Sequence, residues 1–145
     1  MADRERNGYV LSTDQHRVDV DTVHRWLSKD AYWALGRPRE VVEATVRTCS
    51  VWSVFAPDGA QVAFTRAVTD GTTFAWLCDV YVDPMHRGRG LATWLAGAAV
   101  DDLRELGLER IVLATSDAHH VYQRVGFVVP ARADKYMELD LKAGS

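Results

Sequence analysis

The residues best suited to chemistry lie between positions 80 and 92, which read V-Y-V-D-P-M-H-R-G-R-G-L-A. Gly88 and Gly90 can adopt backbone conformations closed to other residues and allow a ligand to approach closely. A helical pattern follows, and the first turn of a helix offers unpaired N–H groups and the positive end of its dipole. This turn predicts an anion site suited to phosphate or pyrophosphate, with Arg87 and Arg89 adding charge at its rim.

Two common nucleotide-binding motifs are excluded by the residues around this turn. No Gly-Lys-Ser/Thr follows it, so it is not a P-loop, and a mononucleotide site is disfavoured. Thr93 stands where the third glycine of a dinucleotide fingerprint would be. The residues alone therefore indicate a phosphate site without naming its ligand.

The elements that must position this turn follow from hydrophobic periodicity and turn signals. Strands are expected at 9–12, 51–55, 61–69, 74–82, 110–115, 127–129 and 136–141. Helices are expected at about 20–27, 40–48, 89–106 and 118–124. This order predicts an α/β fold in which a mixed sheet carries helices on both faces.

Length and composition restrict the classes of protein. The 145 residues, 48% of them hydrophobic, predict one domain spanning 1–145, with residues 1–8 as a flexible tail. The net charge of −3 argues against nucleic-acid binding. No apolar stretch is long enough for a membrane span or a signal peptide, so we expect a cytoplasmic protein with no membrane partner. Cys49 and Cys78 form no C-x-x-C pair and are expected to be reduced core thiols.

Two motifs resemble the GNAT superfamily, the GCN5-related N-acetyltransferases. Positions 87–92, R-G-R-G-L-A, match its R/Q-x-x-G-x-G/A signature, and positions 118–127, A-H-H-V-Y-Q-R-V-G-F, resemble its A-x-x-L/V-Y-x-x-x-G-F motif. The resemblance implies a central, mostly antiparallel, splayed sheet between helices. It also implies transfer of an acetyl group from acetyl-CoA to a primary amine by direct attack, without a metal.

The resemblance further implies where acetyl-CoA would bind. Its pantetheine arm would pair with backbone groups of Val80, Tyr81 and Val82. Its pyrophosphate would be held by the backbone of the motif residues Arg87, Gly88, Arg89, Gly90, Leu91 and Ala92. Thr115 stands where many members carry an asparagine that contacts the cofactor or an ordered water. A threonine hydroxyl could partly replace that contact.

Two residues are candidates for catalysis. The resemblance implies that Tyr122 protonates the departing thiolate, a role that suits a phenol; the alternative is an aromatic ring that only packs. Asp79 is a carboxylate in the most apolar strand, and an unpaired buried charge is costly. It would therefore hold the substrate amine or take its proton through water, or else form a salt bridge with an arginine. The sequence identifies no general base.

Tyr32 and Trp33 lie between the first two helices, where members of the family build the acceptor wall. They are expected to bind substrate, with a core plug or a surface turn as the alternative. The histidines complete no metal-ligand set. We expect a small-molecule amine as the acceptor and leave a homodimer open. The rival hypothesis is a non-catalytic acyl-CoA sensor on the same fold.

Overall fold

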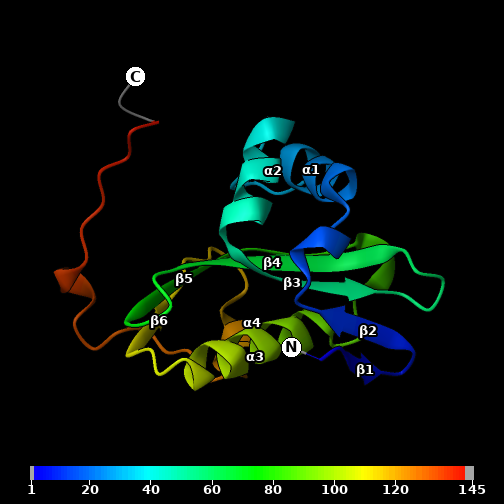
Figure 1. Cartoon of the computed structure of the whole chain (residues 1–145). Coiled ribbons are helices and arrows are strands. Elements are labelled where there is room, and N and C mark those ends of the chain that lie inside the picture. The colour runs from blue at the N-terminus through cyan, green and yellow to red at the C-terminus, as the bar shows by residue number, and fades with distance from the viewer. Residues whose placement is uncertain (1, 143–145) are drawn as a thin grey trace.

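The computed structural model describes residues 2–142. Its sheet contains six strands in chain order (Figure 1). The strands are β1 (Arg4–Arg6), β2 (Tyr9–Ser12), β3 (Ser50–Phe55), β4 (Gln61–Thr69), β5 (Phe74–Val82) and β6 (Arg110–Val112). Neighbours from β1 to β5 pair antiparallel, whereas β5 and β6 pair parallel. The sheet is therefore mixed and mostly antiparallel, as predicted.

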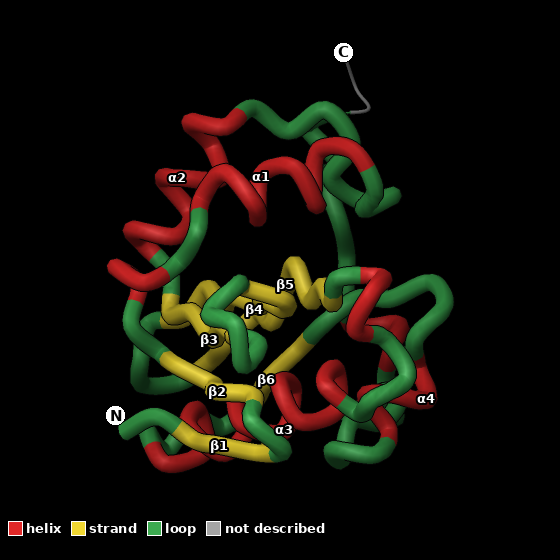
Figure 2. The backbone as a smooth tube through the Cα atoms, turned by 90° about the vertical axis from the view of Figure 1, so that its right-hand side faces the viewer, coloured by secondary structure: helices red, strands yellow, loops and turns green. Residues whose placement is uncertain are grey.

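Helices cover both faces of this sheet. α1 (Val20–Lys29) and α2 (Arg39–Thr48) lie on one face, and α3 (Leu91–Glu105) and α4 (His119–Gln123) lie on the other (Figures 1 and 2). Asp19 caps the N-terminus of α1, because its side chain accepts a hydrogen bond from the N–H of Thr22, a common N-cap arrangement. The predicted α/β layering is confirmed.

The alternation of side chains along the strands divides the buried residues between the two faces. Ala63 in β4 belongs to the same buried cluster as Leu95 of α3, whereas its neighbour Phe64 belongs to the cluster that contains Leu27 of α1. Each face of the sheet therefore has its own apolar layer. The helices are held by these layers, which place α3 and the α1–α2 loop on opposite sides of β5.

The sheet splays between β5 and β6. Their pairing ends at Trp76 opposite Val112, but β5 continues to Val82 along β4. A register shift separates Phe64 from Arg66 in β4, and Asp79 opposite them has a φ of 57°. One extra residue in β5 produces such a bulge and bends the strand. The predicted splay is confirmed, and the bulge lies at its centre.

Both ends of the chain differ from the prediction. Arg4–Arg6, expected in a tail, form β1, and Arg4 pairs with the buried Asp102. The prediction of strands at 127–129 and 136–141 is wrong for the described chain. These residues form loops on either side of a 3-10 turn, Ala133–Lys135. A strand needs a neighbouring edge for its backbone groups. The C-terminal segment instead leaves the sheet and runs apart from it (Figure 1).

Candidate active site

The glycine-rich turn enters α3 in the conformation that an anion site requires. Gly88 and Gly90 have φ values of 80° and 76°, in the left-handed region that favours glycine. Gly90 is the N-cap of α3, so it supplies no side-chain acceptor, and the first turn carries no acidic residue. The N–H groups of this turn therefore have no side-chain cap from Gly90, and the N-terminus of a helix favours an anion. A Cβ at either glycine would meet no atom within 4 Å, so the constraint is backbone conformation and not space.

The two arginines of the turn are anchored to neighbouring elements. Nε of Arg87 donates to the Val82 carbonyl at 2.9 Å, and its guanidinium lies over the Tyr81 ring. Arg89 donates to the hydroxyl of Tyr9 at 2.8 Å. That hydroxyl also lies 2.9 Å from Nδ1 of His86. The Arg87 guanidinium is therefore held against the end of β5, and the Arg89 guanidinium is held against β2.

The end of β5 presents its backbone in the splay. Val80, Tyr81 and Val82 lie beyond the last residue that pairs with β6. The ring of Tyr81 is buried against Trp26, with ring centroids 5.2 Å apart, and its hydroxyl donates to Asp30. Burial and this carboxylate raise the pKa of Tyr81 to about 12. The Tyr81 side chain thus belongs to the α1 face, and its backbone is the part available to a ligand.

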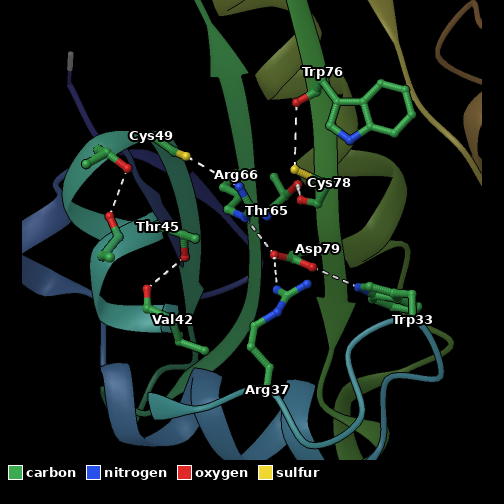
Figure 3. Close-up of polar contacts among 12 residues, drawn as sticks. Trp33, Arg37, Val42, Thr45, Cys49, Thr65, Arg66, Trp76, Cys78 and Asp79 are labelled. Atoms are coloured by element: carbon green, nitrogen blue, oxygen red, sulfur yellow. Dashed lines mark hydrogen bonds and ion pairs between the residues drawn. The ribbon is translucent and has the colours of Figure 1, made fainter. Parts of the chain in front are cut away.

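Asp79 is buried in a charged network (Figure 3). Oδ2 accepts from Nε of Arg66 at 2.6 Å and from a terminal nitrogen of Arg37 at 2.7 Å. Oδ1 accepts from Nε1 of Trp33 at 2.8 Å. The side chain is 1% exposed, and both of its oxygens have partners. The network joins β4, β5 and the α1–α2 loop at the bulge.

The charges in this network decide the ionisation of Asp79. Burial raises the pKa of its carboxyl, but Arg66 and Arg37 outweigh burial and hold the pKa below its ordinary value. A carboxylate of lowered pKa is a poor proton acceptor. The structure therefore contains the alternative predicted for Asp79, a salt bridge with an arginine. Arg66 was missed, although it is a lone charge within apolar β4 just as Asp79 is within β5.

The α1–α2 loop brings two predicted residues to the splay. Trp33 contacts Asp79, and Tyr32 packs edge-on against Trp33 with ring centroids 5.0 Å apart. The hydroxyl of Tyr32 accepts from the backbone N–H of Ser116, which follows β6, at 3.1 Å. The loop therefore joins the two strands where they diverge. Both aromatic rings are about half exposed, so neither is a core plug.

Tyr122 lies on α4 close to this loop. Burial, with smaller contributions from Tyr32 and Asp117, raises its pKa to about 12. Its ring meets Phe127 edge-on, with centroids 6.0 Å apart, and its carbonyl accepts from the N–H of Phe127. The phenol is half-buried and protonated at neutral pH. The structure thus brings together Tyr32 and Tyr122, which are ninety positions apart in the sequence.

Thr115 and Tyr122 line one groove of about 640 Å³ beside β6. The Thr115 hydroxyl accepts from the N–H of Ala118 at 3.0 Å and so supports the turn into α4. The described residues contain no group of three or more side chains suited to hold a metal ion. Among residues 2–142, no helix is long and apolar enough to cross a membrane.

Comparison with known proteins agrees with this geometry. Residues 20–127 match the model of the acetyltransferase (GNAT) family. A Xanthomonas campestris pv. campestris protein assigned to the same family is 41% identical, with a TM-score of 0.86 over 92% of this chain and 93% of its own. A Gibberella zeae protein assigned as an acetyltransferase is 28% identical over 81% of this chain and 77% of its own.

A third comparison concerns the fold alone. N-acetylglutamate synthase from Neisseria gonorrhoeae, complexed with coenzyme A and N-acetyl-glutamate, is 16% identical with a TM-score of 0.69. The match covers 85% of this chain and 28% of the synthase chain. The fold and the site define an acyltransferase of the GNAT class. The chain belongs to the GNAT acetyltransferase family.

Proposed function

We propose that this protein is an N-acetyltransferase that moves an acetyl group from acetyl-CoA to the primary amine of a small molecule by direct attack. The observation that carries the proposal is the N-terminus of α3, which two left-handed glycines leave open beside a splayed strand. A pyrophosphate fits the helix end and an extended arm fits the splay. These are the two binding features that coenzyme A requires.

The residues that would bind the cofactor lie in one continuous segment of the chain, residues 80–92. Gly88, Gly90 and the first turn of α3 would hold its pyrophosphate, with Arg87 and Arg89 beside them. Backbone groups of Val80–Val82 would align the arm as an added strand does. When bound, acetyl-CoA supplies an activated acyl carbon. A backbone N–H of this β5 segment would stabilise the charge that develops on the carbonyl oxygen.

The proton donor in this proposal is Tyr122. Its raised pKa keeps the phenol protonated throughout the physiological range. A protonated phenol can donate to the departing thiolate, which makes that group easier to expel. Tyr122 lines the groove between β6 and α4, next to the splay where the reacting atoms would lie.

Asp79 acts here as a positioning residue. Its ion pairs and its bond to Trp33 hold the α1–α2 loop against β5, and the same loop carries Tyr32 to the opposite side of the splay. Tyr32 and Trp33 would form the wall against which the acceptor amine binds. Aromatic walls suit an amine because a cation is attracted to the ring face.

The test is an acceptor screen monitored by the release of free thiol from acetyl-CoA. Small primary amines should yield turnover that depends on both substrates and produce acetylated amine detectable by mass spectrometry. The same screen is carried out with protein amino groups, and the rates of thiol release are compared with those for small amines. Binding of acetyl-CoA without turnover on any amine would instead support an acyl-CoA sensor.

A further inference from the structure

The network around Asp79 contains two cations and one anion. Among residues 2–142, the ion pairs of Arg37 and Arg66 both go to Oδ2 of Asp79. The side chains of the two arginines are only 20% and 13% exposed, so both charges are largely removed from water. A charge in such surroundings is costly unless an opposite charge balances it. One positive charge is therefore left unbalanced at the bulge of β5.

Two neighbouring groups that could balance this charge do not do so. Burial raises the pKa of the Cys78 thiol, which lies opposite Arg66 in the sheet, to about 11. This sulfur is therefore neutral at physiological pH. Asp30, at the end of α1, accepts a hydrogen bond from Tyr81 and lies 3.7 Å from Arg87. The charge of Asp30 is thus matched by a different arginine.

Arg37 has hydrogen-bond donors that its own chain does not use. It contacts Asp79 through only one of its three guanidinium nitrogens, Nη1 (Figure 3). In the described chain, Nε and Nη2 of Arg37 have no protein partner, and neither is sealed from solvent. These two nitrogens form the side edge of the planar group, which can bind a carboxylate through two parallel hydrogen bonds. The unused edge of Arg37 is therefore suited to a carboxylate from a ligand.

The position of Arg37 suits one end of the acceptor. Trp33 and Arg37 both bond Asp79 from the α1–α2 loop, which carries the aromatic wall proposed for the acceptor. Val80, the residue after Asp79, begins the segment proposed to hold the arm of acetyl-CoA. In an α-amino acid the amine and the carboxylate are attached to one carbon atom. A carboxylate held by Arg37 would therefore keep the amine close to this segment of β5.

We propose that the acceptor is a free α-amino acid, whose carboxylate binds the Nε–Nη2 edge of Arg37 and balances the second charge of the network. This inference rests on the proposed acetyl transfer and names its substrate class. The amine nitrogen forms a bond to the acetyl carbon, and the bond between that carbon and sulfur breaks. The amine loses one proton and the departing thiolate gains one. The products are an N-acetyl amino acid and coenzyme A.

The first measurement compares each standard amino acid with its α-amide, which keeps the amine and the side chain and lacks the negative charge. Release of free thiol from acetyl-CoA gives kcat and KM for both members of each pair. Charge-assisted hydrogen bonds to one carboxylate contribute about tenfold or more in affinity, so the best amino acid should exceed its amide in kcat/KM by at least about tenfold. An amide that is used as well as its amino acid would overturn the proposal.

The variants Arg37→Gln and Arg37→Lys test the residue itself. Arg37→Gln should raise the KM for the amino acid about tenfold or more and change the KM for its amide by less than about twofold. Arg37→Lys should recover part of the loss, because it keeps the charge without the planar edge. The matched control is Arg47→Gln, which removes the same charge from an exposed position of α2 and should change neither KM.

Circular dichroism and urea unfolding check that each variant is folded. A KM that rises equally for the amino acid and its amide in folded Arg37→Gln would make Arg37 a structural residue and overturn its assignment to the carboxylate. If Arg37→Gln does not fold, the comparison of acids and amides on the wild type still decides the substrate class.

Binding separates this inference from the proposed activity. Calorimetry on the wild type saturated with coenzyme A measures the Kd of the same amino acids and amides and requires no turnover. If no amine is acetylated, the proposed function fails, but tighter binding of an amino acid than of its amide would still support the carboxylate site. Equal binding of acids and amides, or binding of neither, would overturn the carboxylate site as well.

Discussion

The hydroxyl of Tyr32 accepts a hydrogen bond from the backbone N–H of Ser116, with 3.1 Å between the oxygen and the nitrogen. This bond joins the α1–α2 loop to the loop that follows β6. Trp33, the next residue, joins the same loop to Asp79 in β5. The two strands that diverge at the splay are thus connected again by adjacent aromatic residues. The width of the opening between β5 and β6 therefore depends on the position of one loop.

Replacing Tyr32 by phenylalanine removes this connection and keeps the ring. A hydrogen bond of this kind contributes about 1 kcal/mol, which corresponds to roughly a fivefold change in an equilibrium constant. We expect the KM for the acceptor amine to rise by about that factor, with kcat and acetyl-CoA affinity nearly unchanged. Steady-state kinetics with each substrate varied would measure this. Leu35→Ala, an exposed position in the same loop, is the control and should leave both KM values unchanged.

Replacing Asp79 by asparagine should mainly reduce stability. Arg66 and Arg37 would lose their carboxylate partner, and breaking a buried ion pair typically costs about 3–5 kcal/mol in the free energy of unfolding. Urea unfolding at neutral pH would measure the loss, with the exposed Asp101→Asn as the control. A variant of unchanged stability that turned over its acceptor slowly would instead assign Asp79 a direct catalytic role.

The same network predicts a dependence of stability on pH. The folded-state pKa of Asp79 is lower than its unfolded value, which is about 3.9. The stabilisation is therefore fully present above the unfolded pKa and is lost as pH falls through the lower folded pKa. The difference in unfolding free energy between wild type and Asp79→Asn should shrink as the pH is lowered below about 4. Chemical unfolding at a series of acidic pH values would show it.

Replacing Gly90 by valine should abolish cofactor binding. Its φ of 76° is costly for a side chain with a Cβ, by about 1–2 kcal/mol per residue, so the turn would rearrange. Gly59, in the β3–β4 turn, has a φ of 89° and equally open surroundings, so Gly59→Val is a control of similar strain away from the site. Both variants should melt at a lower temperature than the wild type.

Only the site variant should lose its response to acetyl-CoA. A ligand at a hundred times its Kd stabilises the folded state by about 2.7 kcal/mol, which raises the Tm by several degrees. Thermal unfolding with and without acetyl-CoA would compare wild type, Gly59→Val and Gly90→Val. A normal shift in folded Gly90→Val would remove the assignment of the turn to the pyrophosphate.

Replacing Tyr122 by phenylalanine removes only the phenolic hydroxyl and so tests the proposed proton donor. The ring that meets Phe127 is kept, so acetyl-CoA binding should survive, whereas kcat should fall by on the order of 10²-fold. Because the pKa of Tyr122 is raised to about 12, the phenol stays protonated below that pH. The pH–rate profiles of wild type and variant should therefore have the same shape between neutral pH and pH 10.

Tyr136→Phe provides the control for this variant, because Tyr136 lines the same groove and loses the same atom. Single-turnover measurements would ensure that chemistry is observed and not product release. Equal rates for Tyr122→Phe and wild type on the true acceptor would make Tyr122 a packing residue.

The sequence by itself determined the parts of this protein that depend on neighbouring residues. Gly88 and Gly90 before a helical pattern specify a left-handed turn into α3, since few other residues adopt that conformation without strain. Period-two and period-3.6 patterns likewise predicted β3 to β5 and the four helices, because burial of one face depends on local spacing. The glycine turn into α3 was accessible at this level, and the resemblance to the family added the splayed sheet.

Only the tertiary structure decided which side chains that are far apart in the sequence came into contact. From the sequence alone, Asp79 could have faced a substrate. The antiparallel register of β4 and β5 places Arg66 beside Asp79. The α1–α2 loop adds Arg37 and Trp33 as further partners of this carboxylate. The C-terminal segment has the alternating pattern of a strand, but in the described chain it does not pair with β6, the last strand of the sheet. Contacts of this kind depend on register, loop path and neighbouring edges, which are properties of the assembled chain and of no single stretch of it.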